Sequence, residues 1–135
     1  MSEREFHLGD VLSVTAGILL SPRHMEGVYD ILKYLTGDNL FTHQLPRARE
    51  AAGPWLLTRY PALVPVTGEC EAAATAESWG STCEAWLVEA ATRYGSYFSL
   101  EPMPASAWLS VDPVKELAAM IGDERVIVVE AGDAP

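Results

Sequence analysis

The segment from Ser21 to Gly37 has the strongest helix signal in the chain and constrains the fold more than any other stretch. Its apolar side chains recur at spacings of three and four residues, which is typical of a helix with one buried face. They are Met25, Val28, Tyr29, Leu32 and Leu35. Ser21 is suited to cap the start and Pro22 to occupy the first helical position, whereas Gly37 is suited to end the helix in a left-handed conformation.

The remaining segments alternate between short helical and short extended patterns, many of them bounded by Gly or Pro. We expect helices over residues 7–17, 45–52, 54–60, 82–95 and 112–122, strands over 18–21, 96–103 and 125–130, an irregular connection over about 61–80, and a frayed tail over 131–135. The pattern predicts a single α+β domain spanning residues 1–135, in which a small mixed sheet of about three strands is covered by four or five helices. The short sheet would leave an exposed edge, which favours a homodimer.

Charge is distributed unevenly along the 135 residues, whose formal net charge is −10. Residues 1–60 hold six Lys or Arg against seven acids, whereas residues 61–135 hold three against twelve. This negative field disfavours direct binding of nucleic acid. No apolar run is long enough to cross a membrane and acids precede the first apolar stretch, so we expect a cytoplasmic protein with no membrane contact.

Polar groups with ligand-binding chemistry gather in residues 20–48. Arg23 and His24 occupy the expected first turn of a helix, where acidic side chains are normally favoured. A bound phosphate or carboxylate would resolve this conflict. Alternatively, Arg23 pairs with an acid such as Glu26 or Asp30, and His24 merely packs.

The second half of this stretch raises the same question. If residues 40–45 are extended, Thr42 and Gln44 face away from His43; if they are helical, His43 and Arg47 share a face. Simple capping ahead of Pro46 is the structural alternative. The candidate ligand-binding residues are therefore Ser21, Arg23, His24, Thr42, His43, Gln44 and Arg47.

Signatures of catalysis and metal binding are missing from the sequence. The three histidines have neither HxH nor HxxxH spacing, and there is no GxSxG elbow or phosphate-binding glycine loop. Cys70 and Cys83 lack a CxxC spacing, which favours reduced thiols. We therefore expect no catalytic residues, no metal and no cofactor.

Two stretches, "FHLGDVLSVTAGILLSPRHMEGVYDILKYLTGDNLFTHQLPRA" and "DPVKELAAMIGDERVIVV", carry a resemblance to known proteins. They resemble an uncharacterised family of small proteins encoded by bacteriophages and prophages, which is known only as a domain of unknown function. The resemblance implies phage origin and action in the host cytoplasm. It transfers no residue roles.

The leading hypothesis is a non-catalytic phage accessory protein that inhibits a host defence by binding a small, phosphate-bearing, nucleotide-like ligand. A second hypothesis is an acidic inhibitor, similar in action to an anti-CRISPR protein, which masks the nucleic-acid-binding surface of a host protein; it would use Glu84, Glu89, Glu116 and Glu124. A nucleotide-acting enzyme with His24 or His43 as general base, and a phage assembly protein, remain open alternatives.

Overall fold

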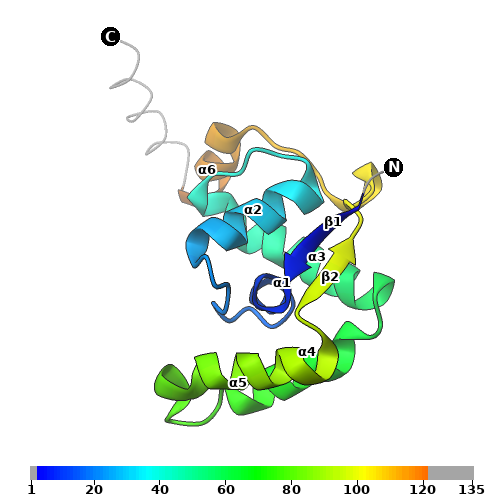
Figure 1. Ribbon diagram of the computed structural model, residues 1–135. Coiled ribbons are helices and arrows are strands. Elements are labelled where there is room, and N and C mark those ends of the chain that lie inside the picture. The colour runs from blue at the N-terminus through cyan, green and yellow to red at the C-terminus, as the bar shows by residue number, and fades with distance from the viewer. Residues whose placement is uncertain (1–2, 122–135) are drawn as a thin grey trace.

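The computed structural model describes residues 3–121, which form six α-helices, two short 3₁₀ helices and one two-stranded sheet (Figure 1). In chain order the elements are β1 (Arg4–His7), α1 (Leu8–Thr15), α2 (Met25–Thr36), the 3₁₀ helix η1 (Thr42–Gln44), α3 (Leu45–Arg59), α4 (Leu63–Ala73), α5 (Trp79–Tyr94), β2 (Tyr97–Leu100), the 3₁₀ helix η2 (Ala105–Ala107) and α6 (Pro113–Ile121). The described chain is a mixed α and β structure, as expected.

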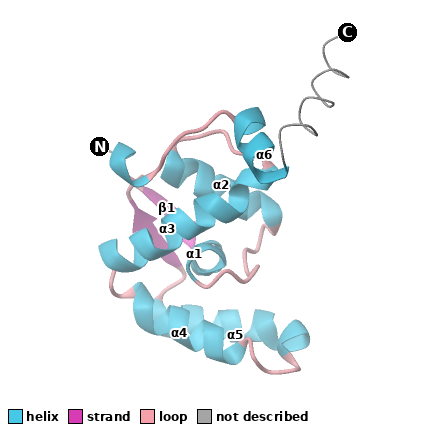
Figure 2. Cartoon of the chain, turned by 180° about the vertical axis from the view of Figure 1, so that it is seen from behind, coloured by secondary structure: helices cyan, strands magenta, loops and turns pink. Residues whose placement is uncertain are grey.

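Helix α1 lies at the centre, with α2 and α3 on one side and the α4–α5 pair on the other (Figures 1 and 2). All residues from Leu8 to Val14 are buried. A helix that is apolar around most of its circumference is suited to such a central position. The short α1 therefore organises the core, although α2 has the clearer sequence signal.

The sheet differs from the expected one in both size and composition. Strand β2 confirms the extended segment expected within residues 96–103, but its antiparallel partner β1 was not expected. Residues 18–21 are not a strand, because the Leu20 N–H donates to the Ser13 hydroxyl of α1 at 2.9 Å and makes no strand ladder. The expected strand over 125–130 and the tail over 131–135 lie outside the described residues.

Three expected helices are confirmed as α1, α5 and α6, and Asp112 caps α6 by accepting a hydrogen bond from the Val114 N–H at 2.8 Å. The predicted start of α2 was wrong, because residues 22–24 form a turn and the helix begins at Met25. The predicted end of α2 is confirmed, because Gly37 follows the last helical residue with a left-handed φ of 73°.

Two further corrections concern proline-containing segments. The expected break at Pro54 is absent, and α3 runs continuously because residues on both sides of this proline, such as Ala48 and Leu56, are fully buried. The expected irregular connection over 61–80 contains α4, whose buried residues Leu63, Val66, Thr67 and Cys70 follow helical spacing. This helix was not expected, because Pro65 and Gly68 are residue types that disfavour the interior of a helix.

Two glycines allow α1, α2 and the loop between them to approach closely. A β-carbon on Gly9 would lie 2.4 Å from the Leu20 carbonyl oxygen. One on Gly27 would lie 1.9 Å from the Ser21 hydroxyl and 2.6 Å from a carboxylate oxygen of Asp10. The contact between α1 and α2 thus requires the absence of a side chain at Gly27.

We predict that Gly27→Ala destabilises the protein by about 1–2 kcal/mol, because overpacking outweighs the higher helix propensity of alanine. Gly68→Ala in α4 is the matched control, since a β-carbon there meets nothing within 4 Å. It should stabilise the protein by about 0.5–1 kcal/mol. Urea unfolding followed by circular dichroism measures both changes, and a Gly27→Ala variant as stable as the parent would contradict the close approach.

Candidate functional site

The first half of the polar stretch is organised by a buried carboxylate, Asp10, which is only 2 % exposed in the first turn of α1. Its Oδ1 accepts a hydrogen bond from the Ser21 hydroxyl, and its Oδ2 accepts one from Nη2 of Arg23 at 2.9 Å. A buried charge requires such partners. Ser21 and Arg23 therefore anchor the loop before α2 onto α1.

Arg23 also donates through Nη1 to Asp30 of α2 at 2.9 Å, and Arg4 of β1 forms a second ion pair with the same carboxylate. The hydrogen bonds from Arg4, assisted by those from Arg23, lower the pKa of Asp30. The pairing of Arg23 with Asp30, which the sequence left open, is present. A phosphate at Arg23 would have to compete with two carboxylates.

The second half of the stretch contacts the chain around α6 instead. The Gln44 amide donates to Glu116 at 3.0 Å, and His43 Nε2 lies 2.8 Å from the Pro113 carbonyl oxygen. Arg47 donates to both carboxylate oxygens of Glu116, at 2.7 and 3.0 Å. Thr42 is the exception, because its hydroxyl is hydrogen-bonded to the Tyr29 hydroxyl of α2.

Arg47 is the centre of this second group. Its guanidinium lies 3.9 Å from the ring centroid of Trp108 and donates to the Leu109 carbonyl oxygen at 2.9 Å. The hydrogen bonds from Arg47, with a smaller contribution from Gln44, hold the pKa of Glu116 below its ordinary value of 4.5. These residues dock the segment around α6 onto α3.

We predict that Glu116→Gln lowers stability at neutral pH by about 1–3 kcal/mol, because Arg47 loses its charged partner. A depressed folded pKa adds stability that is fully present above the unfolded value and is lost as the pH falls through the folded value. The difference in the free energy of unfolding between the parent and Glu116→Gln should therefore decrease below about pH 4.

Urea unfolding at pH 7 and pH 3.5 measures this change. Glu101→Gln is the control, because Glu101 pairs with Arg59 at the surface and its loss should cost less than about 1 kcal/mol. A Glu116→Gln deficit that is equally large at both pH values would contradict the assignment.

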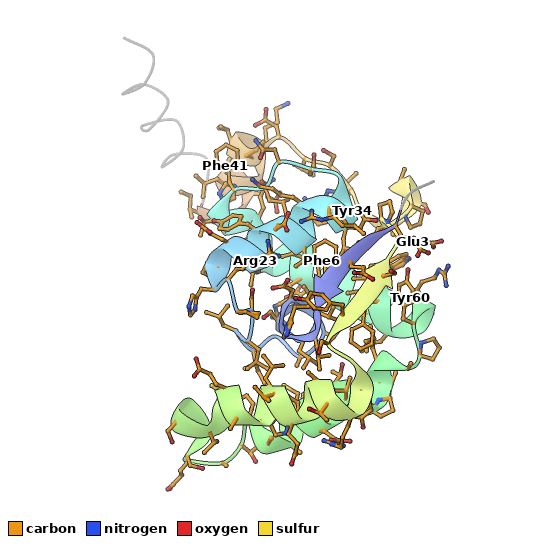
Figure 3. The ribbon with its side chains drawn as sticks, in the orientation of Figure 1. Glu3, Phe6, Arg23, Tyr34, Phe41 and Tyr60 are labelled. Atoms are coloured by element: carbon orange, nitrogen blue, oxygen red, sulfur yellow. The ribbon has the colours of Figure 1, made fainter. Side chains whose placement is uncertain are left out.

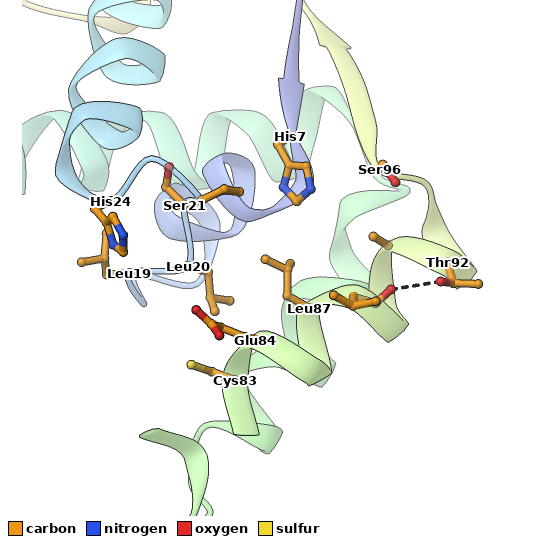
Figure 4. A pocket seen from close by; sticks show the side chains of 13 residues that line it. His7, Leu19, Leu20, Ser21, His24, Cys83, Glu84, Leu87, Thr92 and Ser96 are labelled. Atoms are coloured by element: carbon orange, nitrogen blue, oxygen red, sulfur yellow. Dashed lines mark hydrogen bonds between the residues drawn. The ribbon is translucent and has the colours of Figure 1, made fainter. Parts of the chain in front are cut away.

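A cleft of about 520 Å³ opens between α5 and the loop before α2 (Figure 4). Its apolar lining comes from both sides: Leu19, Leu20, Pro22, Leu87, Val88 and Ala91. Its polar lining includes His7, Ser21, His24, Glu84 and Thr92. No lysine or arginine among residues 3–121 lines it.

The seven predicted residues therefore do not form one site. Ser21 and His24 line the cleft, whereas Arg23 lies beside the start of α2 (Figure 3). Arg23 lines a neighbouring hollow together with Arg4. Thr42, His43, Gln44 and Arg47 are bonded to other parts of the chain. The sequence did not place His7 or Glu84 at a ligand site, because they are distant in the chain and follow no motif.

The two cysteines are free thiols, of which Cys70 is buried and Cys83 is partly exposed and lines the cleft. Burial raises the pKa of the Cys70 thiol to about 11, which keeps it protonated. No group of three or more His, Cys, Asp or Glu within residues 3–121 is placed to hold a metal ion. None of the helices described is long and apolar enough to span a bilayer.

Residues 6–66, from β1 to the beginning of α4, match the family model described as "Domain of unknown function (DUF7736)". This match includes Asp10, Ser21 and His24 but not α5, which forms the other wall of the cleft. No curated protein and no solved structure matches the chain.

Proposed function

We propose that the protein is a non-catalytic binding protein that holds a small ligand in the cleft between α5 and the loop before α2. The observation that carries this proposal is the cleft itself. Its volume of about 520 Å³ falls in the range of small-molecule sites, and a mainly apolar wall with a few polar groups is their usual chemistry.

The lining favours a ligand with an apolar body. Leu20, Leu87 and Ala91 offer contact area but no hydrogen bonds, and Glu84 disfavours an anion near α5. The phosphate-bearing ligand predicted from the sequence stays a proposal, and it requires a phosphate to displace Asp10 or Asp30 from Arg23. An uncharged ligand requires no such displacement.

The biological setting rests on the resemblance to phage and prophage proteins. We propose that the protein acts as a phage accessory protein in the host cytoplasm, where sequestering a ligand would inhibit a host defence process. A ligand that is bound but not converted would produce this effect without any catalytic group.

Ala91→Phe should weaken ligand retention, because the added ring would project from α5 and occupy part of the cleft. The measurement is mass spectrometry of the small molecules released on denaturation from protein purified out of a bacterial lysate. Ala72→Phe, at an exposed position of α4, is the matched control. Identical released molecules from the parent and Ala91→Phe would contradict the cleft as the site.

The acidic surface of α4 and α5 favours a second candidate, an inhibitor that masks a nucleic-acid-binding surface of a host protein. These helices carry four glutamates and one arginine, and Arg93 already pairs with Glu69 at 2.7 Å. Glu71, Glu84 and Glu89 are exposed. Glu116 is removed from this surface by its pairing with Arg47, and Glu124 lies outside the described residues.

For this candidate, the parent protein should capture a host protein, and added duplex DNA should displace that host protein. The triple substitution of Glu71, Glu84 and Glu89 by Lys should abolish the capture. Added salt should weaken the same capture, because the attraction is between exposed charges. Ala91→Phe should leave it intact. Capture that survives both the reversal and salt would rule out an electrostatic interface.

A further inference from the structure

His24 has a strained backbone at the mouth of the cleft. Its φ of 57° and ψ of −137° lie in a region that glycine occupies readily and residues with a β-carbon rarely adopt. It is the only non-glycine residue with positive φ between residues 3 and 121. Such strain persists where the surrounding structure enforces it, and it concentrates at functional sites.

The enforcing contacts lie on both sides of His24. Its N–H donates to the Ser21 carbonyl oxygen at 2.9 Å, and its own carbonyl oxygen accepts from the Gly27 N–H at 3.1 Å. The Ser21 hydroxyl accepts from the Arg23 N–H at 3.1 Å while donating to the buried Asp10. The Asp10 network thus holds the turn closed and His24 in its strained conformation.

This conformation presents the imidazole of His24 to the cleft, on the side opposite Glu84 and α5 (Figure 4). The ring makes no capping hydrogen bond to the start of α2. A second histidine, His7, lies on the same side of the cleft. Its Nδ1 accepts from the Gly9 N–H at 2.9 Å, which leaves the proton of the neutral ring on Nε2.

We propose that the strained turn serves to present His24 as a specificity-determining residue, and that His24 and His7 select an uncharged, largely apolar ligand bearing a hydrogen-bond acceptor. This inference rests on the proposed ligand-binding function of the cleft. The two imidazoles supply N–H donors on one side, and the apolar residues of α5 and the loop enclose the ligand body.

Quinoline and naphthalene form a matched pair of probes, because they have the same shape and only quinoline has an acceptor nitrogen. We expect quinoline to bind about threefold to tenfold more tightly to the parent protein, as one hydrogen bond implies. NMR titration measures both affinities and shows whether the shifted signals belong to cleft residues.

Three substitutions of His24 separate the backbone strain from the contact with the ligand. His24→Gly removes both the ring and the strain, so it should raise Tm by roughly 3–6 °C and reduce the preference for quinoline. His24→Ala removes the ring but keeps a β-carbon, so it should reduce the preference without raising Tm. His24→Gln, which retains an N–H donor, should recover part of the preference.

The outcomes distinguish the proposed role of His24 from the proposed ligand-binding function of the cleft. If both probes bind in the cleft with equal affinity, or if His24→Ala retains the full preference, the role of His24 is overturned while the ligand site stands. If His24→Gly fails to raise Tm, the strain is overturned. If neither probe shifts cleft signals in the parent, or if Ala91→Phe binds them unchanged, the cleft fails as a ligand site as well.

Discussion

The burial of the Asp10 carboxylate is the constraint on which the arrangement of α1 and α2 depends. The N-terminal end of α1 favours a negative charge at this position, but the low exposure of Asp10 removes most of its contact with water. Ser21 and Arg23 replace those contacts only if the loop after α1 returns across its N-terminal end. The position of this loop, and therefore one wall of the cleft, follows from the need to satisfy one carboxylate.

The same interaction explains why α2 starts later than its sequence suggests. Ser21 is a good helix cap in isolation, but its hydroxyl donates to Asp10 and accepts from the Arg23 N–H, so it closes a turn rather than a helix. The first helical residue becomes Met25, and His24 takes up the resulting backbone strain. Gly27 then lies where any side chain would collide with Ser21 and Asp10. One buried hydrogen bond thus links a helix boundary, a glycine and a cleft residue.

A second buried carboxylate, Glu116, plays the corresponding role for the end of the described chain. Arg47 and Gln44 satisfy it, and Arg47 also stacks on Trp108. An arginine in a polar stretch is equally compatible with an external phosphate and with an internal carboxylate, and local sequence does not distinguish them. In this fold the acidic C-terminal half supplies internal partners for basic groups of the N-terminal half, which accounts for part of the uneven charge distribution.

The sequence by itself determined the elements whose period and end signals agree: most of α2 with its left-handed Gly37, α5, and α6 with its Asp112 cap. It also identified Ser21 and His24 as chemically notable residues. Only the tertiary structure decided that β1 pairs with β2, that α3 continues through Pro54, and that His7, His24 and Glu84 line one cleft. The physical reason is range: helix period and capping are local along the chain, whereas strand pairing, burial and the partner of a charge depend on which distant segments pack together.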